Sequence, residues 1–160
     1  MITGEFSITE PEHQESESNP EVESGTSEAA PNPNLDNQNI EHSRNLALAA
    51  ARVASENGGR DIKVLDMTEH TPMFDFFVIA SGSSRRQLHA MSEEIDHKLE
   101  DDLKDRRLNI DGYDESRWIV LDYATVVIHL FDDETRAYYS LESLWADARE
   151  LDLTGIIEEE

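Results

Sequence analysis

The stretch formed by residues 118–131, WIVLDYATVVIHLF, constrains the fold of this chain more than any other. Two runs rich in β-branched and aromatic residues, 118–122 and 125–131, are typical of strands, and the two residues between them predict a β-hairpin. Because side chains alternate along a strand, one face of this hairpin is entirely apolar. The other face is too polar for a core and too aromatic for ordinary solvent-exposed positions, and we expect function there: Trp118, Asp122, His129 and Phe131.

The residues before the hairpin predict one helix and two strands. Ser43 is placed to cap the helix, and the glycine pair at 58–59 ends it. Strands are expected at residues 61–68 and 73–81, which are rich in Ile, Val and Phe.

A long helix is expected next, opening at Ser84 with Gln87 at the spacing of a capping box. Its apolar side chains recur every three or four residues and predict a stripe against the sheet: Leu88, Met91, Ile95, Leu99 and Leu103. The polar residues 106–116 follow as a connection, with a turn at Gly112.

Two helices are expected after the hairpin. The acidic residues 132–134 suit the first turn of a short helix, where negative charge meets the positive end of the dipole. Ser140 can cap the last helix, whose buried side is expected to carry Leu141, Leu144, Trp145, Ala148 and Leu151. The order α-β-β-α-β-β-α predicts a single α/β (α+β) domain, with helices covering a mixed sheet.

Composition divides the chain into segments. Residues 1–40 contain four of the five prolines, nine Asp or Glu and no Lys or Arg, so we expect a disordered acidic tail that cannot offset its ordering entropy by burying apolar surface. The folded domain is expected at residues 41–153, and a frayed acidic C-terminus at residues 154–160.

Charge narrows the class of partner. The net charge is −23, of which −9 lies on residues 1–40 and −14 on the rest. Broad binding of nucleic acid by phosphate neutralisation needs the opposite sign, whereas a basic protein surface is attracted. The alternative is that the acidity serves only solubility.

The sequence also limits the available chemistry and location. It contains no cysteine, which excludes disulfides and thiolate sites. The amino terminus has no basic start followed by an apolar run, and no window approaches the roughly 18 apolar residues of a membrane span. We expect a cytoplasmic protein that does not contact a membrane.

A phosphate-binding or catalytic interpretation rests on the Gly82-Ser83 pair. The pair lies between a strand and a helix, where backbone N–H groups can hold phosphate, and it is similar to the glycine-serine pair of nucleotidyltransferases. Those enzymes also need two carboxylates on the next strand and a third to hold two Mg²⁺ ions. Here that strand offers only Asp122, while Asp132 and Asp133 fall at the far end of the hairpin. The metal set is incomplete, and a capped helix start is the favoured interpretation.

Two arginines and one histidine are further candidates. Arg85 and Arg86 lie in a helix first turn, where positive charge costs about 0.3–1 kcal/mol, so they are candidates for an anion contact such as an rRNA phosphate. The favoured alternative is that nearby acids such as Glu93 and Glu94 neutralise them. His129 has no second metal ligand at suitable spacing and no serine nucleophile beside it. We expect a hydrogen-bonded structural histidine there.

Aromatic residues gather in the last third of the chain. Binding hot spots favour Trp and Tyr, whereas the alternative is an aromatic core. We expect about half of this set to face a partner: Trp118, Tyr123, Phe131, Tyr138, Tyr139 and Trp145.

Five segments, in order, resemble the ribosomal silencing factor, or Iojap-related, family: DIKVLD at 61–66, DFFVIASGSS at 75–84, WIVLDY at 118–123, VIHLF at 127–131 and RAYYSLESLW at 136–145. The resemblance covers residues 43–151. It implies a fold similar to that of nucleotidyltransferases without their catalytic carboxylates, hence no enzyme activity, metal or cofactor. An enzyme acting on a nucleotide through Gly82-Ser83 and Asp122 is the alternative.

The resemblance also implies a partner. Family members bind the large ribosomal subunit on its intersubunit face, at the basic ribosomal protein number fourteen (uL14), and block joining of the small subunit when nutrients are short. A second copy of the chain, in a weak homodimer, is a further candidate partner. Carried over to this sequence, the contact residues are Trp118, Asp122, Tyr123, His129, Phe131, Arg136, Tyr139, Leu141, Glu142 and Trp145. Two pairs depart from the family pattern: Ala124-Thr125 replaces its usual Gly-Asp in the hairpin turn, and Asp111-Gly112 replaces Glu-Gly.

Overall fold

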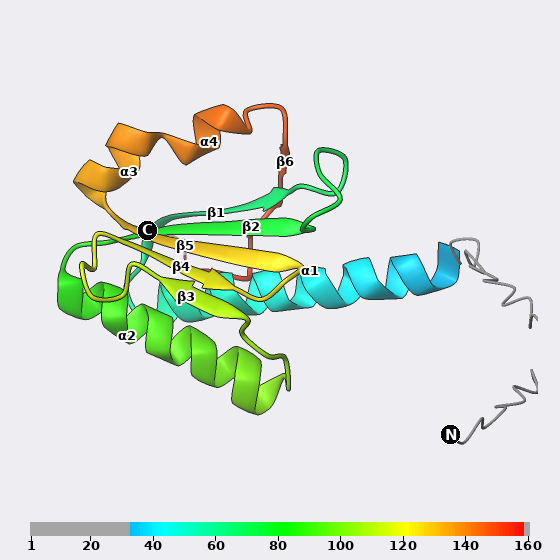
Figure 1. Cartoon of the computed structure of the whole chain (residues 1–160), viewed down its shortest axis with the longest axis horizontal. Helices are drawn as coiled ribbons and strands as arrows, with labels where there is room; N and C mark the ends of the chain where they lie inside the picture. The colour runs from blue at the N-terminus through cyan, green and yellow to red at the C-terminus, as the bar shows by residue number, and fades with distance from the viewer. Residues whose placement is uncertain (1–32, 159–160) are drawn as a thin grey trace, which may run out of the picture. The chain divides into compact units, whose positions relative to one another are not determined.

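A six-stranded mixed β-sheet organises the part of the chain that the computed structural model describes, residues 33–158 (Figure 1). Strands β2 and β5 pair in parallel, and every other neighbouring pair is antiparallel. Across the sheet the order is β3 (Asn109–Asp111), β4 (Trp118–Asp122), β5 (Val126–Asp132), β2 (Phe76–Gly82), β1 (Arg60–Asp66) and β6 (Arg149–Glu150).

The hairpin predicted from the sequence is strands β4 and β5. Trp118 pairs with Phe131 at one end and Asp122 with Val127 at the other. The turn places Ala124 in the left-handed region, at φ 66°. Glycine enters that region without steric cost, whereas the Cβ of Ala124 is strained there.

Helices α1 (Pro33–Glu56) and α2 (Arg85–Asp96) cover one face of the sheet (Figure 1). Helix α2 continues into a π-helical segment, η1 (His97–Asp102). The core on this face takes the predicted apolar side of the hairpin and four of the five residues predicted for the α2 stripe: Leu88, Met91, Ile95, Leu99, Ile119, Leu121, Val126, Ile128 and Leu130. Full burial of such a side chain contributes about 1.5–3 kcal/mol, so this layer supplies much of the stability.

The opposite face of the sheet is covered by α3 (Asp133–Tyr139) and α4 (Leu141–Leu144) (Figure 1). A second, smaller core lies beneath them: Leu65, Met67, Phe77, Ile79, Phe131 and Leu141. Both faces are therefore buried under helices, as expected for an α/β fold. Within residues 33–158, no helix has the length and apolarity to cross a membrane.

The predicted start of the first helix was wrong. Helix α1 begins at Pro33, a favourable first helical residue, so residues 33–40 of the expected disordered tail are helical, while residues 1–32 lie outside the described part. Ser43 is not a cap. It lies within the helix, on its buried side, and its hydroxyl donates to Asp75 Oδ2 at 2.7 Å.

The predicted C-terminal helix was also wrong. Helix α4 has only four residues, and Ser140, at φ 47°, makes no capping hydrogen bond with its side chain. The chain then turns into β6, which pairs with β1 through Glu150 and Arg149. Residues 154–158 were expected to fray. Instead Thr154 forms a bridge with Ile157, and Ile156 and Ile157 pack on the core.

The connection expected at residues 106–116 contains a strand that the sequence did not predict, β3. Gly112 forms the expected turn at φ 74°, where an added Cβ would lie 1.9 Å from the carbonyl oxygen of Trp118. The backbone of Gly112 therefore packs directly against the first residue of β4.

Candidate functional site

The layer formed by α3 and α4 exposes large apolar side chains. Tyr138 is 81% exposed, Tyr139 51% and Leu144 73%, although Leu144 was predicted to be buried. Exposed apolar groups gathered on one element mark interaction sites more often than scattered ones do. We name Trp118, Tyr138, Tyr139 and Leu144 the α3–α4 surface.

The three rings of this surface are in contact at steep angles. The Trp118 and Tyr139 centroids lie 4.9 Å apart with planes at 46°, and those of Tyr138 and Tyr139 lie 5.0 Å apart at 84°. With Glu115, Arg117 and Glu134 they line a hollow of about 470 Å³ beside α3: the walls also include Gly112 and Thr135.

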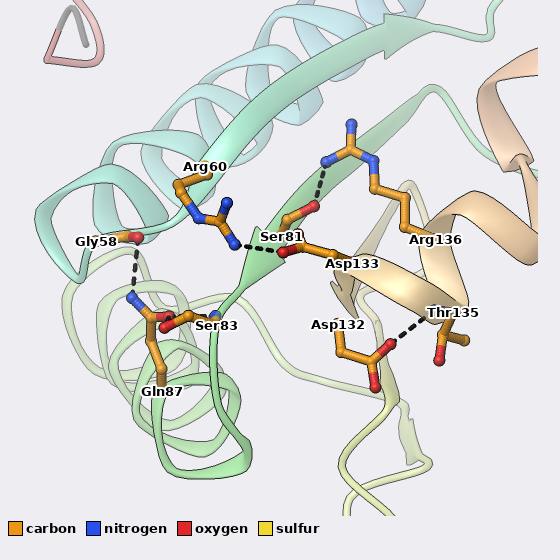
Figure 2. Close-up of polar contacts among 9 residues, drawn as sticks. All are labelled: Gly58, Arg60, Ser81, Ser83, Gln87, Asp132, Asp133, Thr135 and Arg136. Atoms are coloured by element: carbon orange, nitrogen blue, oxygen red, sulfur yellow. Dashed lines mark hydrogen bonds and ion pairs between the residues drawn. The ribbon is translucent and has the colours of Figure 1, made fainter.

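Charged side chains hold the start of α3 in place. Asp132 caps the helix by accepting from the Thr135 N–H at 2.7 Å, a contact drawn in Figure 2. The Arg117 guanidinium joins Asp132 at 3.0 Å and Glu134 at 2.6 Å. Partial burial raises the pKa of Asp132, but the bonds from Thr135 and Arg117 outweigh it and leave the pKa below its usual value. The predicted acidic first turn is confirmed.

Arg136 and Glu142 join α3 to α4 and to the sheet, so the structure places Arg136 inside the layer rather than on a contact surface. The buried Arg136 donates through Nη1 to Ser81 Oγ of β2 at 2.8 Å, as Figure 2 shows, and through Nε to Glu142 Oε1 at 2.8 Å. Burial raises the pKa of Glu142, but a backbone N–H and the Arg136 guanidinium lower it by more, so the pKa lies below its usual value. The pair fixes where the neighbouring Tyr139 and Leu144 are displayed.

Two residues of the expected mixed face lie beneath the α3–α4 surface. Phe131 is fully buried and stacks on Trp118 at 4.9 Å, and His129 is only 6% exposed. Direct contact with a partner is therefore closed to both. The physical reason is that α3 and α4 pack over them, which hairpin alternation alone does not reveal. His129 accepts a hydrogen bond from Trp118, in agreement with a structural histidine.

The remaining predicted contacts occupy different environments. Leu141 belongs to the second core, and Trp145 is half-buried with its centroid 6.2 Å from that of Phe77. Tyr123 lies on the other side of the sheet, where its hydroxyl donates to Asp96 and burial raises its pKa. Tyr123 continues the strand alternation onto the face of Ile119 and Leu121 and is only 2% exposed, so it is not part of the α3–α4 surface.

Asp122 lies far from the α3–α4 surface and also far from Gly82. It shares the strand face of Trp118 but sits at the opposite end of β4, where it accepts from the Ala124 N–H at 2.8 Å. Gly82 pairs with Asp132 in the parallel register, so Gly82 and Asp122 lie at opposite ends of the sheet. A nucleotide site built from both is excluded by this geometry.

The polar groups around Gly82 bond one another (Figure 2). Asp132 and Asp133 lie at the end of the hairpin that is beside Gly82. The Asp133 carboxylate is nevertheless already paired with the Arg60 guanidinium at 2.7 Å. Gln87 Oε1 accepts from the Ser83 N–H at 2.6 Å, and its amide donates to the Gly58 carbonyl at 2.9 Å. In residues 33–158 no cluster of three or more His, Cys, Asp or Glu side chains is suited to a metal ion.

The helix that starts beside Gly82 is capped as predicted. Ser84 Oγ accepts from the Gln87 N–H at 3.1 Å, although the Gln87 side chain returns to Ser83 rather than to Ser84. Arg85 and Arg86 are exposed in its first turn, and Arg85 donates to the Asp114 carbonyl at 2.7 Å. Their anion contact stays a prediction.

Comparisons with known proteins agree with this fold. A family model described as ribosomal silencing factor during starvation (RsfS) matches residues 40–160. The ribosomal silencing factor RsfS of Bacillus subtilis is 35% identical over 111 residues, covering 69% of this chain and 92% of the relative. That of Halalkalibacterium halodurans is 33% identical over 113 residues, covering 70% and 95%.

A mouse protein named mitochondrial assembly of ribosomal large subunit protein 1 is 40% identical over 93 residues, covering 56% of this chain and 40% of its own length. A crystal structure of a Chromobacterium violaceum protein superimposes with a TM-score of 0.60 at 29% identity, covering 67% of this chain and 86% of that one.

Proposed function

Because this chain belongs to the ribosomal silencing factor family, we propose that it binds the large ribosomal subunit at uL14 and blocks joining of the small subunit. Translation is thereby repressed when nutrients are limiting, in the cytoplasm where the ribosomes are. The description of the family includes starvation, and the name of the mouse relative refers to the large subunit.

The α3–α4 surface is the observation that carries the proposal. Trp118, Tyr138, Tyr139 and Leu144 offer aromatic and apolar area that the described part of the chain leaves exposed or half-exposed. Aromatic anchors of this kind dominate binding energy at protein interfaces. Trp145, half-buried at the end of α4, adjoins this layer and extends the proposed contact.

A rigid support lies under the surface. Arg136 and Glu142 tie α4 to α3 and β2, while Phe131 and His129 pack against Trp118 from below. A contact surface held in its bound form loses less conformational entropy on association. These buried residues therefore contribute to binding by positioning the exposed ones.

Charge favours a basic partner surface. Residues 41–160 carry a net charge of −14, so a basic ribosomal protein attracts the domain, whereas exposed rRNA phosphate repels it. Electrostatic attraction mainly sets the association rate, and buried aromatic contacts mainly set the residence time. Once bound, the domain acts by occupying space that the small subunit needs.

Subunit joining with purified components tests the proposal. Large subunits are incubated with the chain at saturating dose, small subunits are added, and the joined fraction is measured by gradient sedimentation. We expect this fraction to fall for the unmodified chain and to recover for Tyr139→Ala. The matched control is Leu108→Ala, an exposed apolar residue in the connection before β3. Full joining in the presence of the unmodified chain is the outcome that overturns the proposal.

A further inference from the structure

The hollow beside α3 combines three aromatic rings with carboxylates. Trp118, Tyr138 and Tyr139 line it together with Glu115, Arg117 and Glu134. Resting on the function proposed above, we propose that this hollow binds one cationic side chain, a lysine or an arginine, of the basic partner protein.

The angles between the rings suit a cation. A positive group is attracted to the face of an aromatic ring when it lies within about 6 Å of the centroid. The Trp118 and Tyr139 planes meet at 46° and the Tyr138 and Tyr139 planes at 84°, so the three ring planes differ in direction, and all three rings line the same hollow. A cation in that region reaches more than one ring face, which a flat stack of rings does not allow.

The charges around the rings have the complementary sign. Arg117 is itself a cation, but Asp132 and Glu134 both bond its guanidinium. These three groups with Glu115 carry three negative charges and one positive charge. No hydrogen bond or ion pair within residues 33–158 engages the exposed Glu115 carboxylate, which is therefore available to a ligand.

The fold keeps this site formed without a ligand. Arg117 bonds to the first turn of α3, and the Trp118 indole bonds to His129 beneath it. Gly112, which also lines the hollow, lies so close to the Trp118 carbonyl that a Cβ would not fit between them. Of the three rings, that of Tyr138 is the most exposed, so it is the wall that a substitution can change with the least effect on the core.

Graded chemistry at Tyr138 tests the cation contact. The full chain carrying Phe, 3,5-difluorophenylalanine, pentafluorophenylalanine or Leu at position 138 is titrated with purified large subunits. We expect Phe to bind within about twofold of Tyr, and the fluorinated rings and Leu to weaken binding progressively, by about 2- to 30-fold in all. Equal affinity for Phe, pentafluorophenylalanine and Leu overturns the proposal, because it shows an apolar contact only.

A charge variant tests the carboxylate wall. Glu115→Gln is expected to weaken binding and to reduce its dependence on salt, because one attractive charge is lost. The control is Asp114→Asn, an exposed neighbouring acid that does not line the hollow. An equal effect of both changes contradicts a local role of Glu115.

A peptide measurement keeps this inference separate from the ribosome. The ¹⁵N-labelled chain is titrated with acetyl-Gly-Lys-Gly-amide, acetyl-Gly-Arg-Gly-amide or the norleucine peptide of the same shape, and the Trp118 indole N–H signal is followed. We expect saturable shifts with one or both of the cationic peptides and a weaker response to norleucine. Equal responses to all three overturn the inference even if large-subunit binding holds. Shifts with the cationic peptides alone support it even if large-subunit binding fails.

Discussion

The Trp118 indole donates a hydrogen bond from Nε1 to His129 Nδ1, 3.1 Å away, and so joins the α3–α4 surface to the second core. Because Nδ1 accepts, the neutral imidazole carries its proton on Nε2, and that atom has no partner within the described residues. The bond fixes the orientation of a ring that is proposed to contact the partner.

His129 makes the stability of the domain depend on pH. Burial lowers its pKa from 6.5 to about 4, so between these values the unfolded chain binds a proton that the folded chain does not. The stabilisation is present above pH 6.5 and is lost as the pH falls towards 4. We expect this residue to lower the free energy of unfolding by about 2 kcal/mol between pH 7 and pH 5.

Urea unfolding at the two pH values measures this difference, with His129→Gln as the comparison. The variant is expected to be less stable at pH 7 and to lose most of the pH-dependent part. An undiminished pH dependence in the variant would assign the effect to other groups.

Arg136 is expected to act on binding through the position of α4. Arg136→Met removes its bonds to Ser81 and Glu142 and leaves a partly buried carboxylate without its cation. We expect a loss of about 2–4 kcal/mol in the free energy of unfolding, with weaker large-subunit binding even where the chain stays folded. Arg136→Lys keeps the charge without the forked geometry and should recover part of the stability. If Arg136→Met lowers affinity while the stability stays unchanged, Arg136 contacts the partner directly.

The hairpin turn is expected to gain stability from a single change. Ala124 adopts φ 66°, a conformation in which a Cβ costs about 1–2 kcal/mol, while glycine loses more entropy on folding. Ala124→Gly should therefore raise the free energy of unfolding by about 0.5–1 kcal/mol, measured in urea. Ala90→Gly, inside α2, is the control and should lower it by about 1 kcal/mol. A lower urea midpoint for Ala124→Gly would contradict the strain at this turn.

Tyr123 and Tyr139 are expected to separate stability from binding. Tyr123→Phe removes the hydroxyl that donates to Asp96, so we expect a loss of about 1–2 kcal/mol in stability and unchanged affinity for large subunits. Tyr139→Ala should change stability little and weaken binding about tenfold or more, because an exposed aromatic anchor is lost. Unfolding in urea and co-sedimentation with large subunits measure the two effects. If Tyr123→Phe weakens large-subunit binding while stability is unchanged, Tyr123 contacts the partner directly.

Local patterns predicted much of the architecture. The period-two alternation of the hairpin is confirmed, because one face meets α1 and α2 in the main core. The cap at Ser84 and the acidic first turn of α3 are also confirmed, since both depend on residues only a few positions apart. Motif resemblance identified the family, which the family model matches independently.

Other features depended on partners distant in sequence. The three residues of β3 form a strand because β4 supplies their hydrogen bonds, and nothing in their own composition indicates it. Ser43 is buried inside a helix, where its hydroxyl donates to Asp75, a residue far along the chain. Leu144 is exposed because α4 ends after one turn, whereas the apolar spacing alone predicted a longer buried helix.

The amino-acid order by itself determined the strands β1, β2, β4 and β5, the helix α2 and which side chains share a strand face, because these properties repeat over two to four residues. Only the tertiary structure decided that His129 and Phe131 lie beneath Trp118 while Tyr138 and Tyr139 lie in solvent. That outcome rests on how α3 and α4 pack across the sheet, and packing between distant segments sets burial independently of local periodicity.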